Sequence, residues 1–126
     1  MKKILIVIAD YYEHISSSLL KSAKYELNNF SLKVIKVPGV FEIPVTISKN
    51  IKKYDAFIAL GCVIKGETPH FDFISSASTH AIMNLSVESK KPIGNGIITC
   101  LNMKQAKARG KKGKEAAQAV VSVLSQ

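Results

Sequence analysis

Residues 4–8 form an unbroken apolar run, Ile-Leu-Ile-Val-Ile, close to the start of the chain. Such a run is typical of a strand covered on both faces within a parallel sheet, because a half-exposed strand would alternate apolar and polar residues. An apolar stripe with a period of four follows it, at Ile15, Leu19, Ala23 and Leu27. The stripe predicts an amphipathic helix over 15–28. A doubly covered strand followed by such a helix favours an α/β fold.

The rest of the chain continues this alternation. We predict further strands over 32–37, 56–63 and 95–100, and further helices over 44–51, 69–89, 103–108 and 114–124. Because crossovers between parallel strands are right-handed, the helices should cover both faces of the sheet. We therefore expect one domain over 1–126, a three-layer α/β sandwich. Its four-stranded parallel sheet should have the flavodoxin-like order 2-1-3-4.

The formal net charge is +9, and six basic residues crowd into positions 104–114. Clusters of this kind can bind nucleic acid. The aromatic residues are not interleaved with the lysines, however, and no zinc-finger spacing occurs, so we expect no nucleic-acid partner. A solvated basic face remains one interpretation, and attraction of an anionic small substrate is another.

The chain has two cysteines, Cys62 and Cys100, each in or beside an apolar run. Two cysteines are too few for a disulfide scaffold and suit buried thiols in a reducing cytoplasm. The apolar stretch near the start ends at Asp10 without a small-residue cleavage pattern, so we expect a buried strand and not a leader. No run approaches the roughly 20 apolar residues that a membrane helix needs, and we expect no membrane partner.

Residues 61–72 combine a candidate anion cradle with a titratable side chain. Gly66 can bring its backbone close to a ligand, Thr68 and Pro69 resemble a helix cap and first turn, and His70 would lie in that turn. The N–H groups of a helix start can hold phosphate without a metal, and an imidazole suits proton transfer near neutral pH. A plain loop with a solvated histidine is the alternative.

Three further segments should meet this turn. Ligands of parallel sheets collect beyond the carboxyl ends of the strands. We expect residues 10–11, 39–42 and 62–70, together with Asn95, to follow such ends and to converge on one edge of the sheet.

Residues 59–72 read ALGCVIKGETPHFD, a segment that closely resembles the signature of the lumazine synthase family. Three more blocks resemble the family in the expected order: VPGVFEIP at 37–44, PIGNGIIT at 92–99 and QAKAR at 105–109. The resemblance extends over residues 3–123. It implies condensation of 5-amino-6-(D-ribitylamino)uracil with 3,4-dihydroxy-2-butanone 4-phosphate to 6,7-dimethyl-8-ribityllumazine, with no metal and no redox cofactor.

The resemblance also implies residue roles on the pyrimidine side. Tyr11 would stack on the pyrimidine, and Glu42 would accept hydrogen bonds from the ribityl hydroxyls. The remaining contacts to the ribityl chain and the ring would come from Val40, Phe41, Cys62, Val63 and Ile64. Asn95 stands where the family usually has a phenylalanine, so an amide would replace a ring face there.

On the phosphate side, the resemblance implies that Glu67 and Thr68 bind through backbone N–H groups and the hydroxyl. Arg109, the only arginine of the chain, would close over the phosphate. Lys112 matches a family lysine near the same group, although the loop before it is shorter than usual. His70 would transfer protons.

Finally, the resemblance implies a homo-oligomer with sites shared between subunits. We favour an isolated pentamer over a sixty-subunit shell. Two other interpretations remain open: a non-catalytic flavodoxin-like module that binds a pterin or flavin-related ligand, and a basic nucleic-acid-binding protein.

Overall fold

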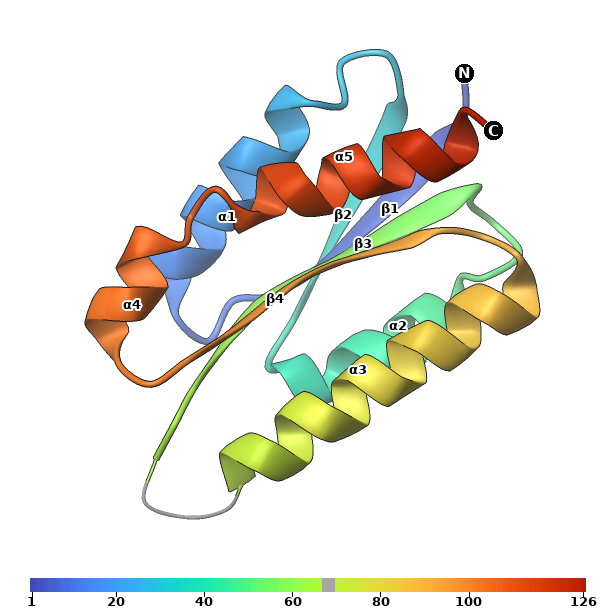
Figure 1. Cartoon of the computed structure of the whole chain (residues 1–126). Helices are drawn as coiled ribbons and strands as arrows, with labels where there is room; N and C mark the ends of the chain where they lie inside the picture. Colours follow the sequence, from blue (N-terminus) through green and yellow to red (C-terminus); the bar gives the residue numbers. More distant parts are fainter. Residues whose placement is uncertain (67–69) are drawn as a thin grey trace.

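The computed structural model describes residues 1–66 and 70–126. Its four strands are β1 (Lys3–Ala9), β2 (Ser31–Val37), β3 (Ala56–Ile64) and β4 (Ile93–Cys100). All neighbouring strands are parallel, and their order is β2-β1-β3-β4, which confirms the predicted topology (Figure 1). The helices are α1 (Glu13–Tyr25), α2 (Ile43–Lys49), α3 (His70–Ser89), α4 (Met103–Ala108) and α5 (Lys112–Leu124), with a short 3-10 turn, η1 (Val40–Glu42).

The sheet lies between two helical layers (Figure 1), as predicted. α1 and α5 pack together over one face, and α2 and α3 cover the other. β1 divides its side chains between the two cores: Ile4, Ile6 and Ile8 face α1 and α5, whereas Leu5 and Val7 join the other cluster. This double covering explains the unbroken apolar run, since neither face of β1 meets water.

Helix boundaries differ from the predictions where backbone packing decides them. α1 ends at Tyr25, and the N–H groups of Glu26 and Leu27 donate to Ala23 O and Lys24 O, which tightens the last turn. α5 starts at Lys112, so Gly113 lies inside the helix. A Cβ atom on Gly113 would collide with the main-chain oxygen of Leu19, and the glycine therefore allows α5 to approach α1 closely.

The predicted position of Asn95 beyond the end of a strand is wrong. Asn95 is the third residue of β4 and pairs with Ala59 in the middle of β3. The glycines on either side of it are both buried under α5. A Cβ atom on Gly94 would collide with Ala116 O, and one on Gly96 would lie 2.5 Å from Leu60 Cδ2.

Within the described ranges, no helix combines the length and the apolar character needed to cross a membrane.

Candidate functional site

A cavity of about 530 Å³ opens where β1 and β3 end, and we call it the main cavity. Its volume lies in the range that small-molecule sites usually have. Seven of the predicted site residues line it: Tyr11, Val40, Phe41, Cys62, Val63, Ile64 and His70. The convergence predicted from strand ends is therefore confirmed for these residues.

Tyr11 stands in the short connection between β1 and α1. This connection is fixed at its start, because the hydroxyl of the buried Ser16 donates a 2.7 Å hydrogen bond to Ala9 O. The ring of Tyr11 meets that of Tyr12 edge to face, with centroids 4.9 Å apart and planes at 78°. Tyr11 remains 75% exposed, so a ring face is accessible to a flat ligand.

The turn η1 brings Val40 and Phe41 to the opposite wall. It can approach the sheet because β3 has a glycine beneath it: a Cβ atom on Gly61 would lie 2.9 Å from Val40 Cγ2. Phe41 is 72% exposed at the rim. Glu42 is half-buried and is not among the residues that line the main cavity, although it directly follows two that do.

Cys62, Val63 and Ile64 form the last part of β3 and the floor of the main cavity. Burial raises the pKa of Cys62 to about 12, with smaller contributions from the charge and the hydrogen bond of Cys100. Cys62 and Cys100 are both free thiols. The Cys62 sulfur is therefore protonated at neutral pH, which argues against a nucleophilic role.

His70 is the first residue of α3 within the structure, and its exposed side chain lines the main cavity. Asp72 lies in the same first turn. The predicted phosphate contacts Glu67 and Thr68 lie outside the described residues.

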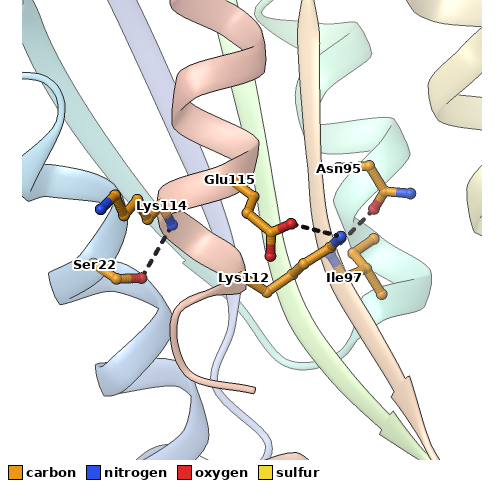
Figure 2. Close-up of polar contacts among 6 residues, drawn as sticks. All are labelled: Ser22, Asn95, Ile97, Lys112, Lys114 and Glu115. Carbon is orange, nitrogen blue, oxygen red and sulfur yellow. Dashed lines mark hydrogen bonds and ion pairs between the residues drawn. The ribbon is translucent and has the colours of Figure 1, made fainter.

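Arg109 and Lys112 line a second cavity of about 480 Å³, beside β4 and the turn between α4 and α5. Arg109 Nη1 donates a 3.2 Å hydrogen bond to Thr99 O. Lys112 Nζ lies 3.7 Å from Glu115 Oε1 (Figure 2). We call this second hollow the arginine cavity. It contains none of the residues of the main cavity, so within residues 1–66 and 70–126 one chain does not bring Arg109 and Lys112 into the same pocket as the predicted pyrimidine contacts.

Asn95 lines neither cavity. Its side chain is exposed, and its Oδ1 accepts a 3.1 Å hydrogen bond from the N–H group of Ile97 (Figure 2). β4 is an edge strand, so one side of it has no neighbouring strand. The Asn95 side chain therefore supplies an acceptor for the N–H group of Ile97 in place of a neighbouring strand.

Gly39 lies in the main cavity as expected, and sequence reasoning missed two of its residues, Tyr12 and Ile74. Ile74 lies one helical turn after His70, which places both on the same side of α3. Burial, and after it the neighbouring Tyr11 and Cys62, raises the pKa of Tyr12, so its hydroxyl stays protonated near neutral pH. Among the residues that the structure describes, no three His, Cys, Asp or Glu side chains group closely enough to hold a metal ion.

Comparison with known proteins shows the family of the chain. A family model described as 6,7-dimethyl-8-ribityllumazine synthase matches residues 1–126. The 6,7-dimethyl-8-ribityllumazine synthase 1 of Rhodopseudomonas palustris is 44% identical, over 97% of this chain and 83% of the relative. The 6,7-dimethyl-8-ribityllumazine synthases of Nitrobacter hamburgensis and Agrobacterium fabrum are each 42% identical, over 95% and 96% of this chain and 82% and 91% of their own lengths. The chain therefore belongs to the 6,7-dimethyl-8-ribityllumazine synthase family.

Proposed function

We propose that the protein is an enzyme of riboflavin biosynthesis, a transferase that condenses 5-amino-6-(D-ribitylamino)uracil with 3,4-dihydroxy-2-butanone 4-phosphate. The products are 6,7-dimethyl-8-ribityllumazine, phosphate and water. One observation carries the proposal: in a chain of this family, the main cavity gathers an exposed aromatic ring, the end of a central strand and an imidazole at one sheet edge.

The main cavity is suited to the aminopyrimidine. Tyr11 offers a ring face for stacking, and the backbone groups at the end of β3 can recognise the polar edge of the ring. Val40 and Phe41 would pack along the ribityl chain, and Glu42 would accept hydrogen bonds from its hydroxyl groups.

The arginine cavity is suited to the phosphate. A guanidinium can bind phosphate through two parallel hydrogen bonds, and Lys112 adds a second positive charge nearby. In this proposal Glu67 and Thr68 complete the phosphate site, and Asn95 contacts the pyrimidine from a neighbouring subunit.

The reaction requires proton transfers that His70 can perform. Attack of the uracil amine on the ketone, with loss of water, gives an imine, and removal of a proton beside that imine lets phosphate leave. Loss of phosphate leaves an enol, which tautomerises to a new carbonyl. The ribitylamino nitrogen attacks this carbonyl, and a second water leaves as the ring closes. A positioned acid or base contributes roughly 10²- to 10⁴-fold, whereas holding two reactants together can supply about 7–11 kcal/mol. Orientation is therefore the larger contribution.

We also propose a homopentamer, whose subunit boundary would join the main cavity of one chain to the arginine cavity of the next. Large apolar side chains on the α2 and α3 side support an interface: Val45, Phe73, Met83 and Val87 are 58–68% exposed. Sedimentation should give a particle of about five protomers of 13.8 kDa each. A much larger particle would favour the shell, and a monomer would contradict shared sites.

The decisive experiment supplies both substrates to the purified protein and records the absorbance and fluorescence of the lumazine. Formation of product is the expected result. A protein that binds a pyrimidine or pterin analogue but forms no product would instead be the non-catalytic module. The cytoplasm is the expected compartment, because both thiols are free and buried.

A further inference from the structure

A third cavity, of about 660 Å³, lies between α1 and the turn that joins α4 to α5. It is larger than the main cavity and contains none of the predicted site residues. Four lysines from both walls line it, Lys21, Lys107, Lys111 and Lys114, and we call it the lysine groove.

Two hydrogen bonds of Ser22 are among the links between the two walls of the lysine groove. Ser22 Oγ donates a 2.8 Å hydrogen bond to Gly110 O and accepts a 3.2 Å hydrogen bond from the N–H group of Lys114 (Figure 2). Gly110 allows this approach, since a Cβ atom there would lie 3.0 Å from Ser18 Cβ. The groove is therefore a fixed depression between packed elements and not a loose loop.

The charge of the lysine groove is mostly unbalanced. Lys114 Nζ lies 3.8 Å from Glu26 Oε1. Within residues 1–66 and 70–126, no ion pair involves Lys21, Lys107 or Lys111. Like charges gathered around one hollow raise the local positive potential, and a bound multivalent anion would relieve their repulsion.

An aromatic ring completes the lining. Tyr25 follows Ser18, Lys21 and Ser22 on the same face of α1, and its side chain is 77% exposed. A ring face beside several ammonium groups is the combination that binds a nucleobase together with its phosphates. We propose that the lysine groove binds a nucleoside polyphosphate, with its phosphates among the lysines and its base against Tyr25.

The lysine groove is separate from the site of the proposed reaction. It shares Ala108 and Lys111 with the arginine cavity, so the turn between α4 and α5 forms a wall between the two. Arg109 and Lys112 line only the arginine cavity. The inference therefore does not depend on the proposed function, and Arg109 can be used to distinguish the two sites.

Calorimetric titration of the full chain with ATP and with inorganic tripolyphosphate tests the proposal. We expect saturable binding with one ATP per chain, and at least tenfold weaker binding by the Lys21→Gln/Lys107→Gln variant. Lys52→Gln/Lys53→Gln removes the same charge from two exposed lysines elsewhere and should bind normally. Tyr25→Ala should weaken ATP binding several-fold and leave tripolyphosphate binding unchanged. Arg109→Ala should retain ATP binding.

A second measurement needs no substitution. ATP should protect Lys21 and Lys107 of the unaltered protein from acetylation, as read by mass spectrometry, and should not protect Lys52 or Lys53. Absence of saturable binding would overturn the proposal, as would equal weakening by the two lysine pairs, which would indicate diffuse charge. Loss of ATP binding in Arg109→Ala would assign the ligand to the arginine cavity, and binding of oligonucleotides but not of ATP would indicate a nucleic-acid surface. Either result would also contradict the proposal.

Discussion

Arg109 and Thr99 meet at the edge of the sheet, where the guanidinium Nη1 donates to the main-chain oxygen of Thr99 at 3.2 Å. Arg109 follows the end of α4 and is exposed. A guanidinium has five N–H donors, so this contact orients the side chain and uses only one of them. In the proposed phosphate site, the remaining donors would bind the anion.

Replacement of Arg109 tests the proposed phosphate site. Arg109→Ala should raise the KM for the butanone phosphate by about 10- to 100-fold, since a hydrogen bond to a charged group contributes about 1.5–3 kcal/mol. Arg109→Lys should give an intermediate KM, because lysine keeps the charge but cannot bind two phosphate oxygens in parallel. Steady-state kinetics with varied butanone phosphate would measure both. An unchanged KM in Arg109→Ala would remove Arg109 from the site.

His70→Ala should lower kcat by roughly 10²- to 10⁴-fold and leave measurable turnover, because orientation of the two substrates does not depend on the imidazole. We also expect Arg109→Ala to lower kcat in addition to raising KM, because the phosphate is then poorly oriented, so that its kcat/KM falls at least as much as that of His70→Ala. Product absorbance under saturating substrates gives kcat. A His70→Ala protein that is folded, binds ligand normally and has no turnover at all would contradict this ranking.

Gly94→Ala should destabilise the fold by about 1–3 kcal/mol, because its new methyl group would meet the main-chain oxygen of Ala116 and force α5 away from β4. Urea unfolding followed by circular dichroism measures the change. Gly66→Ala is the control: a Cβ atom there meets nothing within 4 Å, and we expect a shift of less than about 0.5 kcal/mol. Equal destabilisation by the two substitutions would show that packing under α5 is not the cause.

The thiol of Cys62 should resist alkylation in the folded protein. Its pKa is raised to about 12 from the ordinary 9.0, so the thiolate that reacts with iodoacetamide is scarce at pH 8. Peptide mass spectrometry should show much slower labelling of Cys62 in buffer than in urea. Equal rates in the two solvents would disprove the burial effect.

The same pKa shift predicts a change of stability with pH. The folded state holds the thiol proton more tightly than the unfolded chain does. This contribution to the free energy of unfolding is complete below pH 9.0 and is lost as the pH rises through about 12. Cys62→Ala should remove that part of the alkaline dependence, as urea titrations at several pH values would show.

Local sequence patterns were sufficient to predict the strand order of the sheet and seven residues of the main cavity. The apolar run of β1 predicts a strand buried on both faces, and the stripe of α1 predicts a helix buried on one face. The carboxyl ends of the strands in a parallel sheet meet at one edge. Tyr11 and His70 could therefore be assigned to one cavity from sequence.

Features that depend on distant backbone contacts could not be predicted in this way. Gly94 and Gly96 resemble a turn in sequence, and only the presence of α5 above them shows why a strand needs glycine there. The separation of Arg109 from the main cavity likewise depends on where the turn after α4 packs, which no local pattern encodes.

The hydroxyl of Ser22 fastens α1 to residues on both sides of that turn, 88 and 92 positions further along the chain. A small change in α1 would therefore be transmitted to the backbone that carries Arg109, although no residue of α1 lines the arginine cavity. Substitutions in the first quarter of the sequence would thus shift the position of Arg109, and in the proposed phosphate site this shift would change the affinity for the anion.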